Sequence, residues 1–354
     1  MLPKKLFNKS HRFFILPTDR SNREIVKSTL IIHQGAIGDF ILSLPPLEAI
    51  HRFYSQARFI FLGNPSILEI IHARPYFEAV LNCAEKRWAP LHNLKGKMET
   101  GVFASLPPVD SIFAFCRSSS QTLVDNLARI YEKPSYRIDP FPEPDLRLHV
   151  SEYQCRQLEE LGIPSLPCPA SVIAPSPEDF LEARRFVQEK VTAGNQLVLC
   201  HPGSGGRKKL WSVTGWLDVI MSISTNNNIK TCLIAGPADG RIVQQLCSEV
   251  GSPSLLLASN WPLGRLAALM KHSSLYLGND SGITHLAAAC NTPTIALFGP
   301  TDPNIWGPQG PKVTVVSWQS KSSAHDLKKE SEKTSKPPAE TPLVLELARS
   351  YLEI

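Results

Sequence analysis

The chain has 354 residues and a net charge of +5, and 43% of its residues are hydrophobic while 19% are charged. That composition excludes a disordered chain and a charged fibre. The length exceeds the size at which one hydrophobic core keeps growing, so we expect a globular protein of two domains. The eight cysteines stand singly, without zinc-site spacing, which favours reduced thiols in a cytoplasmic protein.

Both ends of the chain are basic. A basic edge suits an anionic partner such as a membrane surface or a phosphorylated glycolipid, whereas solvated tails are the plainer interpretation, and no nucleic-acid partner is expected. The apolar stretch from Phe13 to Leu16 is too short for a signal-peptide core or a membrane span. We therefore expect a cytoplasmic protein that at most contacts the inner face of the cytoplasmic membrane peripherally. The basic residues are Lys4, Lys5, Lys9, Arg12, Lys321, Lys328 and Lys329.

Apolar runs of strand length alternate with helix-period segments in both halves of the chain, more regularly in the second half. Repeated strand, helix and strand indicate βαβ units and a parallel sheet, so the expected fold class is α/β with two Rossmann-like halves. The expected strands span residues 29–33, 58–62, 79–82, 111–115, 197–200, 231–235, 254–257, 275–277, 294–298 and 313–316. The expected helices span residues 38–54, 65–72, 213–224 and 263–272.

Proline-rich and polar stretches divide the chain. Prolines crowd residues 163–177, which places the passage between the domains there, and residues 319–342 hold almost nothing apolar, which indicates a flexible linker. The apolar residues that follow predict a last amphipathic helix. The expected organisation is a basic extension over 1–27, a first domain over 28–170, a second domain over 171–318, the linker over 319–342 and a helix over 343–354.

A Gly-x-x-Gly turn with an aspartate follows the first expected strand, at Gly35, Gly38 and Asp39. Glycines at a strand-to-helix turn let the backbone approach a ligand, and the start of the helix offers unpaired N–H groups. The spacing matches neither the dinucleotide fingerprint nor a Walker loop. Asp39 is either a carboxylate stabilised by the helix dipole or a functional group, and the turn by itself leaves both interpretations open.

A second glycine-rich loop, over residues 201–211, follows the strand at 197–200. Ser204, Gly205 and the neighbouring glycines free backbone N–H groups, while the cations from Arg207 to Lys209 supply charge for a phosphate or diphosphate. In open α/β sheets ligands bind beyond the carboxyl ends of the strands, where this loop lies. An exposed turn with solvated charges is the alternative.

A third turn, over residues 278–285, joins the strand at 275–277 to a helix of small residues. Asp280 or Ser281 is either a helix cap or a ligand-binding group, and His285 is either a core histidine or part of a site. Together with the second loop, this turn puts two helix starts in one domain, which favours a diphosphate site.

These three motifs, in this order, resemble glycosyltransferase family 9, the ADP-heptose:lipopolysaccharide heptosyltransferases and their relatives. The resemblance runs over about residues 28–317. It is carried by the Ile37–Asp39 turn leading to Leu44 and Pro45, by the loop ending in Lys209, Leu210 and Trp211, and by residues 279–285 with the continuation to Pro303.

The resemblance implies a GT-B architecture, in which two Rossmann-like domains face each other across a cleft. It assigns the acceptor to the first domain and a nucleotide-sugar donor to the second, with Asp39 as the catalytic base and Lys209 as the phosphate contact. Asp280, Ser281 and Gly282 would hold the donor sugar and diphosphate. The expected donor-binding residues are Gly35, Gly38, Ser204, Gly205, Lys208, Lys209, Gly236, Asp280, Ser281, Gly282 and His285.

The resemblance also implies the reaction and its partners. We expect a metal-independent, inverting transfer of a sugar, most simply heptose from ADP-heptose, to a lipopolysaccharide-core, lipid-linked or similar oligosaccharide acceptor. No further cofactor is expected, the protein is expected to be a monomer, and the C-terminal helix is expected to dock on the N-terminal domain. The long extension, the polar insert and Ser281 in place of the more usual threonine depart from the family pattern and leave donor and acceptor open.

Two functions of other classes remain as alternatives. A non-catalytic nucleotide-sugar-binding protein of the same fold would keep the second and third motifs without needing Asp39. A Rossmann oxidoreductase would need a Gly-x-Gly-x-x-Gly turn followed by an acidic residue, and the chain has neither convincingly. A glycosyltransferase with a different donor is the nearest variant of the main hypothesis.

Overall fold

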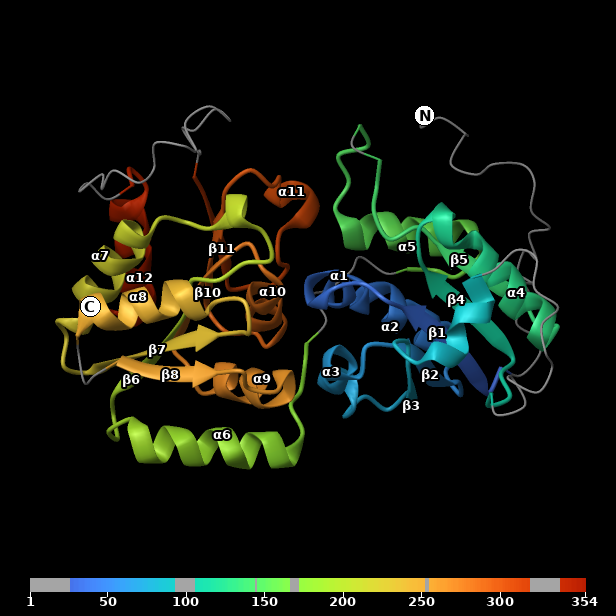
Figure 1. Cartoon of the computed structure of the whole chain (residues 1–354), viewed down its shortest axis with the longest axis horizontal. Coiled ribbons are helices and arrows are strands. Elements are labelled where there is room, and N and C mark those ends of the chain that lie inside the picture. The colour runs from blue at the N-terminus through green and yellow to red at the C-terminus, as the bar shows by residue number, and fades with distance from the viewer. Residues whose placement is uncertain (1–25, 93–105, 144, 166–171, 252–254, 319–337) are drawn as a thin grey trace.

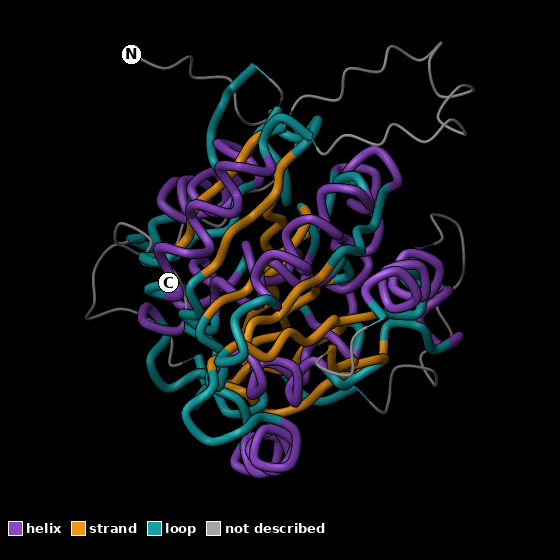
Figure 2. Tube along the Cα trace, turned by 90° about the vertical axis from the view of Figure 1, so that its left-hand side faces the viewer, coloured by secondary structure: helices purple, strands orange, loops and turns teal. Residues whose placement is uncertain are grey.

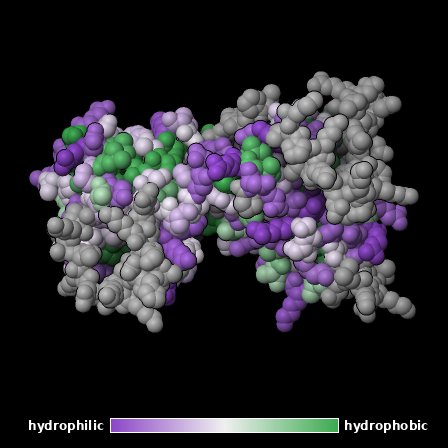
Figure 3. All heavy atoms as spheres, turned by 90° about the horizontal axis from the view of Figure 1, so that it is seen from above, coloured by the Kyte–Doolittle hydropathy of each residue, from purple (hydrophilic) through white to green (hydrophobic). Residues whose placement is uncertain are grey.

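The structure is a computed structural model that describes residues 26–92, 106–143, 145–165, 172–251, 255–318 and 338–354. The chain forms two α/β domains side by side (Figure 1), and the view from above shows two lobes that meet at a waist (Figure 3). The expected N-terminal extension and polar linker lie almost wholly outside the described residues.

The first domain is built on a parallel five-stranded sheet with the order β3-β2-β1-β4-β5. Its central strand β1 is buried on both faces, because Ile31 packs into one apolar cluster and Leu30 and Ile32 pack into another. A strand covered on both faces reads as one continuous apolar run. The strands are β1 (Ser28–His33), β2 (Arg58–Gly63), β3 (Phe77–Asn82), β4 (Ser111–Phe115) and β5 (Ser135–Ile138).

Strand β5 was not predicted, because it is short and only alternate residues are buried. The predicted helix over 38–54 is wrong as a single element. It divides at Ser43, since Pro45 and Pro46 have no N–H to donate to the carbonyl groups one turn earlier. The helices are α1 (Ile37–Leu42), α2 (Leu44–Phe53), α3 (Pro65–Leu68), η2 (Glu69–Ile71), η3 (Lys86–His92), η5 (Ser118–Ser120), α4 (Gln121–Tyr131) and α5 (Val150–Glu160).

The second domain is built on a parallel six-stranded sheet with the order β11-β10-β9-β6-β7-β8. Strands occupy the centre and helices surround them (Figure 2). The strands are β6 (Gln196–His201), β7 (Ile229–Ala235), β8 (Leu255–Ser259), β9 (Leu275–Asn279), β10 (Thr294–Phe298) and β11 (Val313–Ser317). The helices are α6 (Pro177–Lys190), η6 (Arg207–Lys209), α7 (Val213–Ser224), α8 (Gly240–Val250), α9 (Leu263–Lys271), α10 (Gly282–Ala289), α11 (Pro303–Trp306) and α12 (Thr341–Leu352).

Each sheet has one point where the strand order reverses. The reversal lies between β1 and β4 in the first sheet and between β6 and β9 in the second. Loops diverge from the carboxyl ends of the two strands at such a point, and the space between them is where ligands bind in α/β folds. The predicted motifs follow β1, β6 and β9, so all three lie at a reversal point.

The last helix does not dock where it was predicted to. Helix α12 packs on α7 of the second domain, and its Val344, Ala348 and Leu352 join the apolar cluster of that domain. The side chain of Gln196 donates a hydrogen bond to the Leu352 carbonyl at 3.2 Å. The predicted docking on the N-terminal domain is therefore wrong, because the apolar face of α12 finds its complement on α7. In the described part of the chain, no helix has both the length and the apolar character that a membrane span requires.

Candidate functional site

The two reversal points meet because helices α1 and α10 pack against each other at the junction of the domains (Figure 1). Two glycines make this contact possible. A Cβ on Gly282 would lie 2.7 Å from the Cβ of Ile37, and a Cβ on Gly38 would lie 3.2 Å from Cδ2 of His285. The space beside Gly38 and Gly282 is therefore taken up by the opposite helix. The sequence had predicted that glycines in these turns let the backbone approach a ligand; in the structure, Gly38 and Gly282 let the two helices approach each other.

Asp39 sits in the first turn of α1, and one of its oxygens is already bound. Oδ2 accepts a hydrogen bond from the Ala36 N–H at 3.1 Å, as expected of a carboxylate at a helix start. Oδ1 has no partner among the described residues. Burial raises the pKa of Asp39, while the Ala36 N–H and the positive charges of Lys209 and Arg117 partly oppose that rise. The structure therefore shows the helix-start contact for Oδ2, while the functional role of Asp39 stays a prediction.

His33 lies behind this turn and is 4% exposed. Its Nδ1 accepts from the Gly35 N–H at 3.4 Å, so Nε2 carries the proton and donates to Ser43 Oγ at 3.2 Å. Ser43 in turn donates to the Asp39 carbonyl at 2.9 Å. Burial lowers the pKa of His33 to about 4, which keeps the ring neutral. A Cβ on Gly35 would lie 2.9 Å from the Cβ of Asp39, so glycine is needed there for space.

In the second domain, Lys209 forms an ion pair with Asp280, with Nζ 2.8 Å from Oδ2. Asp280 is 4% exposed, whereas its neighbour in sequence, Ser281, caps α10 by accepting from the Thr284 N–H at 3.4 Å. Arg207 and Lys208 are exposed. Of the three consecutive cations, the structure thus directs Lys209 to the predicted turn and leaves Lys208 in solvent.

Three hydrogen bonds fasten the β6 loop to the end of β9. Ser204 Oγ donates to the Asp280 carbonyl at 2.6 Å, and Asn279 Nδ2 donates to the Pro202 carbonyl at 2.7 Å. The Trp211 N–H donates to Asn279 Oδ1 at 3.2 Å. The start of α10 and the loop that carries Lys209 are therefore one connected unit. Gly205 stands apart from it, with no atom near the place of a Cβ.

A buried histidine links this unit to a third loop. Nδ1 of His201, at the end of β6, lies 3.1 Å from Ser281 Oγ, and its Nε2 lies 3.2 Å from Oδ2 of Asp239. Asp239 also accepts from the Gly236 N–H at 2.8 Å. Burial acts to raise the pKa of Asp239, but the hydrogen bonds from His201 and Gly236 outweigh it, so the pKa is lowered and the carboxylate stays ionised. Gly236, predicted to bind the donor, has this internal bond in the structure.

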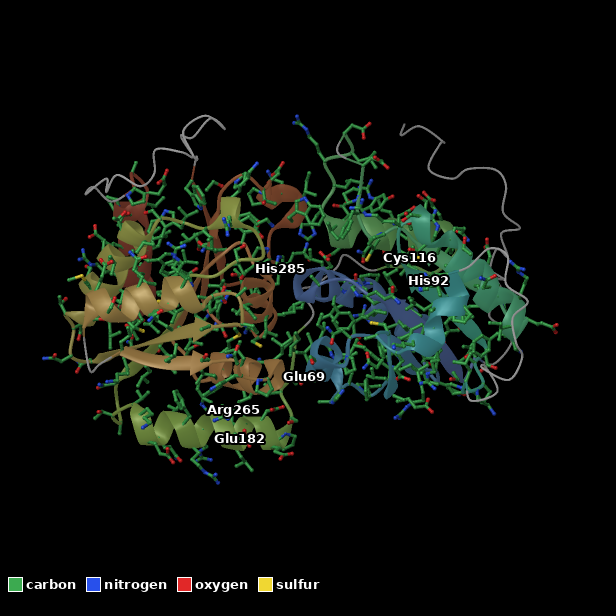
Figure 4. All side chains as sticks on the ribbon, in the orientation of Figure 1. Glu69, His92, Cys116, Glu182, Arg265 and His285 are labelled. Atoms are coloured by element: carbon green, nitrogen blue, oxygen red, sulfur yellow. The ribbon has the colours of Figure 1, made fainter. Side chains whose placement is uncertain are left out.

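His285 lies where the two domains meet (Figure 4) and is 5% exposed. Burial lowers its pKa to about 4; Asp280 opposes this change, whereas His149 and Lys209 add to it. Its Nδ1 has no hydrogen-bond partner among the described residues. A neutral ring whose buried Nδ1 lacks a partner can donate to or accept from a bound group there, depending on its tautomer. His285 therefore fits the predicted place beside the site.

Sequence reasoning missed the residues that bridge the domains. His149, at the start of α5, donates from Nε2 to the Gly307 carbonyl at 2.9 Å. The rings of Phe141 and Trp306 lie 5.0 Å apart, and the Arg117 guanidinium lies 5.1 Å from the Phe141 ring centroid. No motif marks these residues. The one available signal was that Arg117 follows β4, the other strand of the first reversal point.

The structure thus brings together most of the predicted site from two domains. Asp39 comes from the first domain, whereas Lys209, Asp280, Ser281 and His285 come from the second. Lys208 and Gly205 are exposed, and Gly236 lies in the neighbouring turn after β7. The described residues contain no group of three His, Cys, Asp or Glu side chains arranged to hold a metal ion.

The family model described as glycosyltransferase family 9 (heptosyltransferase) matches residues 157–336. Lipopolysaccharide heptosyltransferase 3 of Escherichia coli is 30% identical over 163 residues, which are 45% of this chain and 47% of that protein. The K12 strain protein of the same name is 23% identical over 336 residues, which are 86% of this chain and 92% of that protein.

Solved structures agree on the fold. The glycosyl transferase family 9 protein from Veillonella parvula superposes with a TM-score of 0.73 at 20% identity, covering 92% of this chain and 97% of that chain. An iron-containing dodecameric heptosyltransferase, TibC, superposes with a TM-score of 0.53 at 14% identity, covering 93% of this chain and 78% of that chain. The predicted GT-B architecture of two parallel-sheet domains is confirmed.

Proposed function

Because the chain belongs to glycosyltransferase family 9, we propose that it transfers heptose from ADP-heptose to a lipopolysaccharide-core or similar glycan acceptor, with inversion at the anomeric carbon. The observation that carries this proposal is the contact of α1 with α10. It brings a carboxylate from one domain to a cation and a helix start from the other, and a sugar transfer between two bound substrates needs both.

Asp39 would act as the general base. Transfer requires a group that takes the proton of the acceptor hydroxyl as its oxygen attacks the anomeric carbon. Oδ1 of Asp39 is available for that proton, since the Ala36 N–H holds only Oδ2. The raised pKa moves the carboxylate towards the operating pH of a base, and the supports behind the turn restrict its direction.

Lys209 and the start of α10 would stabilise the leaving group. As the bond from the anomeric carbon to the diphosphate oxygen breaks, negative charge gathers on the departing nucleoside diphosphate. The first N–H groups of α10 have no partner within the helix, and the half-exposed side chain of Lys209 pairs with Asp280 at the start of that helix. A bound diphosphate would compete with Asp280 for the ammonium and so draw Lys209 towards the reacting bond.

Arg117 would contribute to the acceptor side. It follows β4, carries a positive charge that acts on Asp39, and lies against the Phe141 ring, which pairs with Trp306 across the junction. An aromatic pair offers an apolar face to a sugar ring, and a guanidinium binds carboxylate or phosphate in a bidentate way. This arrangement favours an acceptor that carries an acidic group.

We propose that the transfer needs no metal ion, because Lys209 and the α10 N–H groups supply the positive charge at the diphosphate. TibC, which has a similar fold, contains iron, so metal independence needs a direct test. The transfer rate of purified protein should be unchanged by a chelator and by added Mg²⁺ or Fe²⁺. A rate that falls with the chelator and returns with one metal would refute metal independence and leave the sugar transfer intact.

The function itself is tested with a donor panel. Purified protein is mixed with ADP-heptose, or with ADP-, GDP- and UDP-hexoses, together with core oligosaccharide acceptors, and mass spectrometry measures both nucleoside diphosphate release and acceptor mass. We expect an acceptor mass gain of one heptose with ADP-heptose. Gain with another donor would reassign the sugar. Tight donor binding without any mass gain would favour the non-catalytic binding protein.

A further inference from the structure

Asp239, His201 and Ser281 form a buried chain of hydrogen bonds that joins three loops at the carboxyl edge of the second sheet. Asp239 follows β7, His201 is the last residue of β6 and Ser281 follows β9, and the two links measure 3.2 Å and 3.1 Å. His201 is 3% exposed. Filling this space alone would not require a histidine, because an apolar side chain needs no hydrogen-bond partners. His201 instead supplies a partner to both the Asp239 carboxylate and the Ser281 hydroxyl.

The direction of each proton in this chain follows from its ends. An ionised Asp239 only accepts, so His201 presents Nε2–H to it, and in the neutral ring Nδ1 then carries a lone pair. With that tautomer Ser281 donates its hydroxyl proton to Nδ1 at 3.1 Å, in competition with Thr284 Oγ1 at 3.2 Å. The opposite tautomer would place a nitrogen lone pair against a carboxylate. The hydroxyl oxygen of Ser281 keeps its lone pairs for other donors, and one of them accepts from the Thr284 N–H at 3.4 Å.

The loops are shaped to admit this chain. A Cβ on Gly203 would lie 2.0 Å from Oδ1 of Asp239, so only glycine leaves room for the carboxylate beside the β6 loop. The Gly236 N–H holds the other carboxylate oxygen, Oδ2, at 2.8 Å. The position of Asp239 is thus set by Gly203 and Gly236, independently of His201. The orientation of the His201 ring follows from the position of that carboxylate.

We infer that His201, directed by Asp239, is a positioning residue that holds Ser281 in its capping orientation and so keeps the start of α10 preformed for the donor diphosphate. The inference rests on the proposed function, in which that helix start receives the diphosphate. His201 touches no reacting atom. It acts by holding the hydroxyl proton of Ser281 in the hydrogen bond to Nδ1, so that this proton does not face the donor site. The N–H groups of Gly282 and Ile283 would then stay in place for phosphate oxygens.

Two substitutions of His201 separate its two contacts. His201→Asn keeps a polar atom near the position of Nδ1 and can still accept from Ser281, whereas His201→Gln keeps an N–H near the position of Nε2 and serves only Asp239. Calorimetry with ADP as the probe measures the effect. We expect His201→Gln to weaken ADP binding by about 10-fold, which is the effect of losing one hydrogen bond of ordinary strength. His201→Asn should keep most of the wild-type affinity for ADP.

A double-mutant cycle shows whether His201 acts through Ser281. If it does, Ser281→Ala weakens ADP binding, and His201→Gln adds nothing further in that background. The melting temperature is recorded for each variant, because a purely structural histidine would lower it without this pattern in affinity. Asp239→Asn breaks the chain from its other end and replaces the His201 variants if they fail to fold.

The outcomes are distinct. If the wild-type protein binds neither ADP nor any other nucleoside diphosphate, the proposed function fails and the inference fails with it. If the wild type binds ADP but His201→Gln binds within about 2-fold of it, the inference alone is overturned, because 2-fold is less than the loss of one hydrogen bond. Equal losses from His201→Gln in the wild-type and Ser281→Ala backgrounds would also overturn it, since the effect would then bypass Ser281.

Discussion

At the carboxyl edge of the second sheet, the side chains of three loops bond to one another. Ser204, Asn279 and His201 each join one loop to the next. In the turn after β1, at the corresponding edge of the first sheet, the side-chain bonds of His33, Asp39 and Ser43 stay within that turn. There, His33 and Asp39 hold only the segment from Gly35 to Ser43, and Oδ1 of Asp39 has no partner in the described part of the chain.

This difference matches what each edge is proposed to bind. A diphosphate carries several charges in a fixed arrangement, so a site for it gains from several groups held in place before binding. A general base needs one correctly directed oxygen. The family model covers residues 157–336, which include the densely bonded edge and exclude Asp39, so the donor side is the part that the chain shares most clearly with its relatives.

The largest expected effect lies at the sparse edge. Asp39→Asn should lower kcat by about 100-fold to 10,000-fold, since a positioned base is lost, while the free energy of unfolding changes by at most about 1 kcal/mol because the amide still caps the turn. Steady-state kinetics and chemical denaturation measure both. Asp110→Asn is the matched control, because Asp110 accepts backbone N–H groups at the opposite edge of the same sheet. A near wild-type kcat would place the base elsewhere.

At the densely bonded edge, Lys209→Ala should weaken nucleoside diphosphate binding by about 10-fold to 150-fold, because a charge-assisted contact contributes about 1.5 to 3 kcal/mol. Calorimetry with ADP measures the loss. Lys208→Ala should have a smaller effect, since that side chain is exposed, and Lys312→Ala at the far end of β11 serves as the charge control. Equal losses from all three variants would indicate general electrostatic attraction instead of a directed contact.

The contact that unites the two edges is tested by Gly282→Ala. The added Cβ would lie 2.7 Å from Ile37, so the domains must shift apart, at a cost of about 1 to 3 kcal/mol. Small-angle scattering should show a larger radius of gyration, and transfer should slow even though Asp39 and Lys209 are intact. Gly240→Ala is the control, since a Cβ there meets no atom within 4 Å. Unchanged dimensions and rate would mean that α1 and α10 separate readily.

The two edges should respond alike to acid, because each buries one neutral histidine, His33 or His285, whose pKa is lowered to about 4. The unfolded chain protonates these rings below the ordinary value of 6.5, while the folded protein resists protonation. Stability is therefore complete above that value and falls by about 1.4 kcal/mol per pH unit for each histidine as the pH drops towards 4. Chemical denaturation between pH 7 and pH 4.5 measures the slope.

Substituting either histidine with glutamine should flatten the slope by one such increment. If His285→Gln flattens the dependence of stability on pH and His33→Gln does not, only the buried histidine of the second domain destabilises the fold in acid.

The local pattern of the chain determined the elements and the place of the motifs. Alternating apolar strands and amphipathic helices predicted two parallel sheets, and parallel strands send the turns after β1, β6 and β9 to one edge of each sheet. Asp39, Ser281 and the run of cations from Arg207 to Lys209 could therefore be located from their neighbours in sequence. The break at Ser43 was also open to prediction, since Pro45 and Pro46 cannot continue a helix.

Only the tertiary structure decided which edges meet. The contact of α1 with α10, the bond from His201 to Asp239 and the docking of α12 on α7 join residues far apart in sequence. Such contacts depend on which apolar faces fit together and which glycines leave room, and periodicity carries no information about either. Lys208 and Lys209 show how local this effect is. The two residues are identical and adjacent in sequence, and the fold of the loop brings only Lys209 into an ion pair with Asp280 among the described residues.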